Sequence, residues 1–166
     1  MKQFLILILF LFLVLPVVAQ EKLTEVDLRV NAVGSGTSYP TVIEKFGKPR
    51  RTETEKFDAV SACSGSAETH LTLFYLGLEI TLLGDGKGRN LAVYTIEVTS
   101  PKWSASGVNI GAAPKDILAK FGEPSNKEEE SGETVCYYVT KGNLGVVKFH
   151  FRNSRLIKIV MAATLC

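Results

Sequence analysis

An internal repeat constrains the fold of this 166-residue chain more than any other feature of its sequence. A shift of 75 positions aligns residues 33–49 with residues 108–124 without a gap. Because each copy in such a repeat is one supersecondary unit, the same local fold is predicted twice. The identical pairs are Val33 and Val108, Gly36 and Gly111, Lys45 and Lys120, Phe46 and Phe121, Gly47 and Gly122, and Pro49 and Pro124.

Each copy carries signals that begin a short helix. In the first copy, Thr37 and Ser38 offer an N-cap, and Pro40 suits the opening turn because its missing N–H costs little there. In the second copy Pro114 has this place, and the charge of Asp116 favours the helix N-terminus. The same helix start is therefore predicted in both copies.

Both predicted helices bear one apolar stripe and end at a glycine. Gly47 and Gly122 can adopt the left-handed conformation that closes a helix, and Pro49 and Pro124 prevent its continuation. Helices this short need a sheet to pack on. The stripe residues are Val42, Ile43 and Phe46 in the first copy, and Ile117, Leu118 and Phe121 in the second.

Antiparallel strands are predicted after each helix. Their ranges are 70–76, 78–83 and 91–98 in the first copy, and 134–140, 145–152 and 156–164 in the second. Alternation points one set of apolar side chains toward the helices, namely Leu78, Ile80, Leu82, Val147, Phe149 and Phe151. We therefore expect an α+β fold of two tandem helix-plus-antiparallel-meander repeats, with the helices on one face of the sheet.

Two segments leave alternatives open. Residues 50–67 exceed their counterpart in the second copy, and form either an extra strand or a loop. Residues 100–107 join the copies and contain Trp103, which is expected to pack between them. Exposure of this tryptophan as a contact residue is the alternative.

The first 19 residues predict a secretory signal peptide. Lys2 supplies the positive start, residues 4–18 are apolar except for Pro16, and Ala19 ends a small-residue exit. Because this helical run would span only about 22 Å of a ~30 Å hydrocarbon core, an uncleaved membrane anchor is the less favoured alternative. The predicted division is a signal peptide over 1–19 and repeats over 20–101 and 102–166.

Charge and cysteine content limit the partners and the compartment. Loss of Lys2 with the signal peptide leaves 18 basic and 17 acidic side chains, which does not support a nucleic-acid or membrane-surface partner. A periplasmic or secreted location is expected, with no membrane span after signal cleavage. Cys63, Cys136 and Cys166 predict one disulfide and one free thiol, but all three pairings and an all-reduced state are open.

The glycine, short helix and Phe-Gly-x-Pro element resemble the SmpA/OmlA (BamE-like) envelope proteins. Doubled in tandem, the pattern resembles the fold of the secreted beta-lactamase inhibitor protein. The resemblance implies the same helix-and-meander fold, and its doubled form implies inhibition of a secreted enzyme. BamE-like proteins are typically lipoproteins, whereas Gln20 stands here in place of a lipid-attachment cysteine. In this chain the motif comprises Gly36 with residues 42–49, and Gly111 with residues 117–124.

No motif predicts catalysis, a metal or a cofactor. Cys63 and His70 could form a thiol nucleophile and base, but without an orienting group a structural cysteine and a surface histidine are expected. His70 and His150 lack the spacing of zinc ligands. Residues 84–89 lack the Gly-Lys-Ser/Thr ending of a phosphate loop and predict a hairpin turn, and residues 127–131 predict a solvated charged loop.

One surface pattern predicts a binding face. If the copies form one continuous sheet, the strand positions that point away from the helices are split by charge. Such a face could recognise a partner of complementary polarity, although a merely solvated sheet face is the alternative. Its outward members are Lys148, His150, Arg152 and Lys158 in the second copy, and His70, Thr72, Glu79, Thr81, Thr95 and Glu97 in the first.

The expected function is that of a non-enzymatic protein-binding module of the bacterial cell envelope. Its partner is an unknown envelope or secreted protein, and the expected binding residues are Lys148, His150, Arg152, Lys158, Glu79 and Glu97. The alternatives are an inhibitor of a secreted enzyme, and a thiol-dependent enzyme or redox protein that uses Cys63.

Overall fold

The computed structural model describes residues 27–59, 65–140, 142 and 145–163. Within these ranges, one helix followed by four strands occurs twice along the chain. The first set is α1 (Tyr39–Phe46), β1 (Arg51–Phe57), β2 (Glu68–Tyr75), β3 (Leu78–Asp85) and β4 (Ala92–Val98). The second set is α2 (Pro114–Phe121), β5 (Asn126–Glu130), β6 (Glu133–Val139), β7 (Gly145–Arg152) and β8 (Arg155–Ala163).

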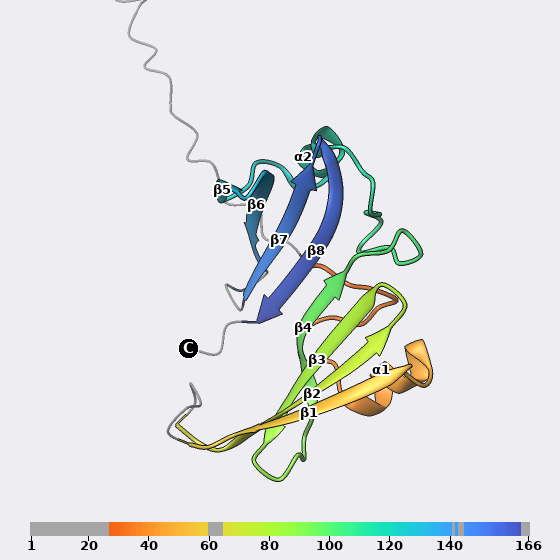
Figure 1. Cartoon of the computed structure of the whole chain (residues 1–166), viewed down its shortest axis with the longest axis vertical. Coiled ribbons are helices and arrows are strands. Elements are labelled where there is room, and N and C mark those ends of the chain that lie inside the picture. Colours follow the sequence, from red (N-terminus) through yellow and green to blue (C-terminus); the bar gives the residue numbers. More distant parts are fainter. Residues whose placement is uncertain (1–26, 60–64, 141, 143–144, 164–166) are drawn as a thin grey trace, which may run out of the picture.

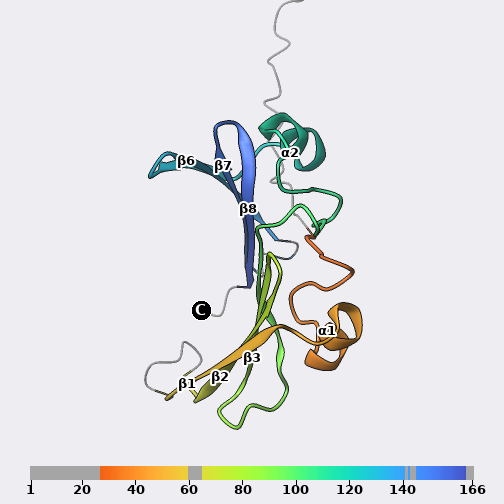
Figure 2. The same ribbon diagram turned by 45° about the vertical axis from the view of Figure 1, so that its right-hand side comes forward.

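All of these strands form one antiparallel sheet in the order β1-β2-β3-β4-β8-β7-β6-β5. The two sets meet at their last strands, where Glu97 of β4 lies opposite Val160 of β8. Both helices lie on the same side of the sheet, which confirms the predicted α+β fold (Figure 1). The outer strands at both ends bend toward the helix-free side, so that this face is concave (Figure 2).

The helix ends follow the predicted chemistry. Gly47 and Gly122 adopt φ angles of 73° and 74°, and each donates a backbone hydrogen bond of 2.8 Å to the carbonyl four residues earlier. At the start of α2, Asp116 accepts a 2.9 Å hydrogen bond from the backbone N–H of Ala113. Ser38 occupies the N-cap of α1 but makes no side-chain capping bond, and its hydroxyl oxygen lies 3.1 Å from that of Thr41.

The core lies between the helices and the sheet. Val42 of α1 is fully buried, and Ile117 and Phe121 of α2 are also buried. The prediction for Leu118 is wrong, since this side chain is 41% exposed and lies outside the core-facing stripe. The strand prediction is confirmed, because all six side chains expected to point toward the helices are buried: Leu78, Ile80, Leu82, Val147, Phe149 and Phe151.

Two strands differ from the sequence-based expectation. Residues 51–57, for which a strand or a loop was open, form β1 paired with β2. The prediction of a loop over residues 127–131 is wrong, because residues 126–130 form β5 at the opposite edge of the sheet. An edge strand keeps its charged side chains in water while its backbone pairs with β6, and charged edges oppose strand-to-strand aggregation.

Trp103, in the segment between the two sets, contacts elements of the first set. Its ring packs edge-on against Phe46 of α1, with a centroid distance of 5.5 Å. Its Nε1 donates a 2.8 Å hydrogen bond to the carbonyl of Leu76 in the β2–β3 turn. These two contacts hold the linker against α1 and the β2–β3 turn.

Several predictions concern residues outside the described ranges. These are the signal peptide over 1–19, Cys63, and Cys166 with any disulfide that involves either cysteine. Cys136 is described and carries a free thiol. In the described part of the chain, neither helix has the length and apolarity needed to cross a bilayer.

Candidate binding face

The strand register places one residue of every strand in a single line across the helix-free face. We call this line the central row. Its centre carries charge, and each half of it holds one aromatic ring. In sheet order, the central row consists of Arg51, Phe74, Glu79, Glu97, Val160, Lys148, Tyr137 and Asn126.

Two carboxylates face each other in the first half of the central row. Glu79 of β3 lies directly opposite Glu97 of β4, and both side chains are half-buried. Burial, followed by the negative charges of Glu97 and Glu53, raises the pKa of Glu79, and Arg51 only partly offsets this effect. Among the described residues, neither Glu79 nor Glu97 forms an ion pair.

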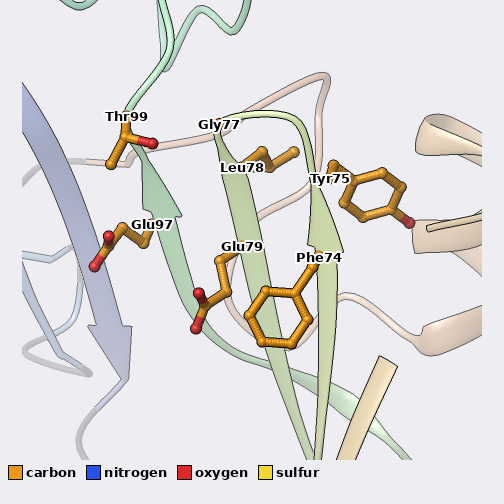
Figure 3. A pocket seen from close by; sticks show the side chains of 7 residues that line it. All are labelled: Phe74, Tyr75, Gly77, Leu78, Glu79, Glu97 and Thr99. Carbon is orange, nitrogen blue, oxygen red and sulfur yellow. The ribbon is translucent and has the colours of Figure 1, made fainter. Parts of the chain in front are cut away.

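A shallow hollow of about 120 Å³ adjoins this carboxylate pair. Figure 3 shows Glu79 between Glu97 and the ring of Phe74, with Tyr75 turned to the other side. The guanidinium of Arg51 lies 3.9 Å from the centre of the Phe74 ring. The hollow thus combines negative charge with an aromatic wall, and both features attract cations. Its lining residues are Phe74, Tyr75, Gly77, Leu78, Glu79, Glu97 and Thr99.

Basic side chains gather in the second half of the face. The ammonium of Lys148 lies 5.2 Å from the centre of the Tyr137 ring, and Lys158 lies opposite His150. Burial, followed by the positive charges of Lys158 and Lys148, lowers the pKa of His150, although Glu133 opposes this shift. His150 is therefore neutral at neutral pH, and the two lysines supply the positive charge near the centre.

Glu133 neutralises part of the basic side. It accepts a 2.6 Å hydrogen bond from Arg152, and its other oxygen lies 3.3 Å from Nδ1 of His150. Burial opposes a low pKa for Glu133, but the hydrogen bonds from His150 and Arg152 outweigh it and lower that pKa. Arg152 is thus committed to an ion pair within the chain, whereas Lys148 and Lys158 form none among the described residues.

A neighbouring row changes from polar to apolar at the boundary between the two sets of strands. Thr72 and Thr81 lie opposite each other with their hydroxyl oxygens 3.2 Å apart, and Thr95 extends this polar row. The row becomes apolar where it crosses into the second set of strands. In sheet order it consists of Glu53, Thr72, Thr81, Thr95, Ala162, Val146 and Val139.

The structure thus places all ten outward residues expected from the sequence on one face, but it does not bring His70 to the charged centre. The ring of His70 packs against that of Phe57 at a tilt of 50° and a centroid distance of 4.5 Å, and its Nε2 lies 3.6 Å from a carboxylate oxygen of Glu68. The rings of Phe74 and Tyr137 are members of the face that sequence reasoning missed. Their outward parity on β2 and β6 would have found them, had aromatic as well as charged positions been considered.

A second hollow lies on the helix side, between α2 and the edge of the sheet. Its volume is about 310 Å³, and Ile117, Leu118 and Phe151 give it apolar walls. Cys136 and Tyr138 also line it, and burial raises the pKa of the Cys136 thiol. A raised pKa leaves little reactive thiolate at neutral pH, so this thiol has the properties of a structural cysteine.

The described residues offer no cluster suited to a metal. No three His, Cys, Asp or Glu side chains of that part of the chain gather in ligand geometry. At the end of β3, Asp85 accepts hydrogen bonds of 3.0 and 2.9 Å from the backbone N–H groups of Lys87 and Arg89 in the following turn. These bonds, that from Arg89 foremost, lower the pKa of Asp85, so a carboxylate already holds the N–H groups that a phosphate would need.

Comparison with known proteins does not assign a family. No family model matches the chain, and no curated protein matches it. Among solved structures, an extracellular protein containing an SCP domain from Bacillus anthracis aligns with a TM-score of 0.46 at 13% identity. That alignment covers 77% of this chain, which spans only 43% of the Bacillus anthracis chain.

Two further solved structures have lower scores. A DUF4309 family protein from Bacillus subtilis gives a TM-score of 0.40 at 10% identity, covering 76% of this chain and 78% of its own. A candidate beta-lactamase inhibitor protein from Streptococcus mutans gives 0.30 at 20% identity, covering 73% and 79%. All three TM-scores are below 0.5, so they decide neither fold family nor function. The predicted BamE-like resemblance has no counterpart among these comparisons, whereas the inhibitor resemblance has one at this low similarity.

Proposed function

We propose that this chain is a non-enzymatic, exported protein-binding module that binds its partner through the helix-free face of the sheet. The observation that carries the proposal is the cross-strand pair of Glu79 and Glu97. Two like charges directly opposite each other destabilise an antiparallel sheet. A positively charged group of a partner would offset the repulsion between the two carboxylates and form a favourable ionic contact with both. Binding residues commonly lower the stability of a fold in this way.

The concave shape of the face also supports the proposal. Neither helix covers it, and its aromatic and charged side chains converge on one central row. Arginine and aromatic side chains are common at the energetic centres of protein interfaces, and Arg51, Phe74 and Tyr137 provide them here.

We also propose that the module consists of two tandem copies of one unit. In the first set, the hydroxyl of Tyr75 donates a 3.1 Å hydrogen bond to the carbonyl of Gly47 after α1. In the second set, the hydroxyl of Tyr138 donates a 3.0 Å hydrogen bond to the carbonyl of Gly122 after α2. The same tyrosine-to-glycine hydrogen bond in both sets, which we call the clasp, supports a common origin of the two sets.

Capture from an envelope extract of the producing organism tests the proposed function. Tagged mature protein is compared with Lys148→Glu/Lys158→Glu on the face and with Lys115→Glu/Lys120→Glu on α2, which makes the same change in net charge. We expect a specific partner that the face variant loses and the α2 variant retains. Equal capture by all three proteins would contradict the assignment of the helix-free face. Inhibition of a secreted enzyme and thiol chemistry at Cys63 remain predictions that no described residue tests.

A further inference from the structure

We infer that the central row binds a convex segment of another protein that presents two opposite charges about 10 Å apart. A basic side chain of that segment enters the hollow beside Glu79 and Glu97, and an acidic side chain meets Lys148. The inference rests on the proposed function and specifies the chemistry of its partner.

The strand register sets the spacing of the two charges. Glu97 and Lys148 lie in the same row, with only Val160 of β8 between them. Since adjacent strands are about 4.8 Å apart, the two backbone positions are separated by about 10 Å. The half-buried Val160 presents no polar group between the charges.

The hollow fits a cationic group. Its volume of about 120 Å³ equals several water molecules, which is enough for an ammonium or guanidinium group. Glu79 and Glu97 supply the opposite charge, and the Phe74 ring, on which the guanidinium of Arg51 stacks, forms the wall beside Glu79. Burial, with the charges of Glu97 and Glu53, raises the pKa of Glu79 although Arg51 opposes this shift, and neither Glu79 nor Glu97 has an ion-pair partner among the described residues.

The basic half of the central row likewise carries a charge that forms no ion pair among the described residues. Lys148 is held against the Tyr137 ring and forms no ion pair within the described chain. Lys158 is likewise without a carboxylate partner there, whereas Arg152 is paired with Glu133. An acidic side chain of the partner therefore meets Lys148 as the available cation in the central row.

A second copy of this chain is a poorer occupant. Its own charge-split face would be complementary in sign, but both faces are concave. Two concave surfaces touch at their rims, which keeps Lys148 of one copy away from Glu97 of the other. A convex segment, such as a helix, reaches both charges because helical positions i and i+7 share a face and are about 10.5 Å apart.

Short stapled helical peptides serve as probes of this charge pattern. Three fluorescent peptides differ only at positions i and i+7, which carry Arg and Glu, Arg and Arg, or Gln and Gln. Binding to the mature chain is measured by anisotropy at low salt. Exposed ion pairs are individually weak, so we expect the Arg/Glu peptide to bind about two- to thirtyfold more tightly than the Gln/Gln peptide.

The variant Lys148→Glu decides the assignment. In this variant the preference for the Arg/Glu peptide should be reversed, so that the Arg/Arg peptide binds more tightly. Lys115→Glu on α2 makes the same charge change and should leave the preference unaltered. Circular dichroism verifies that both variants are folded.

Equal affinity of the wild-type chain for all three peptides would overturn the inference. A reversed peptide preference in the control variant Lys115→Glu would also overturn it. Self-association that Lys148→Glu abolishes, measured by analytical ultracentrifugation, would also overturn it, because the occupant would then be a second copy. If the extract yields a face-dependent partner while the peptides are not distinguished, the inference fails and the proposed function stands. If capture is also independent of the face, both fail.

Discussion

Replacing Glu79 by Gln removes one of two opposed carboxylates while keeping the size of the side chain. Glu79 and Glu97 are directly opposite on β3 and β4, and like charges in this position typically cost 0.2–1 kcal/mol, so we expect the free energy of unfolding to rise by about 0.5 kcal/mol. For a domain of this size, that gain corresponds to a rise in Tm of about 2 °C. Glu123→Gln is the matched control, because its exposed carboxylate is outside the strand pairs.

The pH dependence of this gain follows from the sign of the pKa shift. Folding raises the pKa of Glu79 above its ordinary value of 4.5, so the folded state retains the proton more strongly than the unfolded state. The cost of the charge is therefore absent below pH 4.5 and develops as pH rises through the raised pKa. We expect urea unfolding to show the gain of Glu79→Gln at pH 7 and its disappearance near pH 4. A variant that is less stable than wild type at pH 7, or a gain independent of pH, would refute the reasoning.

Three further predictions concern the supporting structure. Tyr138→Phe removes the hydrogen bond to the Gly122 carbonyl, so urea denaturation should show a free energy of unfolding that is lower by about 1 kcal/mol. An unchanged free energy of unfolding would argue against the clasp. Gly47→Ala adds a Cβ to a residue with a φ of 73°, and no other atom lies close to this Cβ. Thermal unfolding should therefore show a loss of about 1 kcal/mol of stability that comes from the backbone conformation alone. An unchanged Tm would contradict the left-handed helix end. Because burial raises its pKa, Cys136 should react with iodoacetamide more slowly than free cysteine at pH 7.5, and equal rates in peptide mapping would contradict the burial of the thiol.

Local signals in the sequence predicted those parts of the fold that depend on neighbouring residues. The helix ends at Gly47 and Gly122 follow from glycine and proline chemistry within three positions. The inward set around Ile80 and Phe149 follows from the two-residue period of a strand. These features needed no knowledge of which strands are neighbours.

Features that depend on strand pairing were harder to predict. The charged residues of β5 suggested a loop, because nothing in their sequence reveals that β6 supplies hydrogen bonds to their backbone. The prediction for Leu118 failed because an eight-residue helix rests on the sheet with only a narrow stripe. The position of Glu79 directly opposite Glu97 could be predicted only from the register of β3 and β4, which is fixed by the whole sheet.

Site-specific photo-crosslinking tests the central claim most directly. A photoreactive amino acid replaces Thr81 on the helix-free face in one protein, and the exposed Leu118 of α2 in another. After irradiation in an envelope extract, we expect position 81 to crosslink to one specific protein and position 118 to give none. Specific crosslinks from position 118, with none from position 81, would contradict a partner bound on the helix-free face.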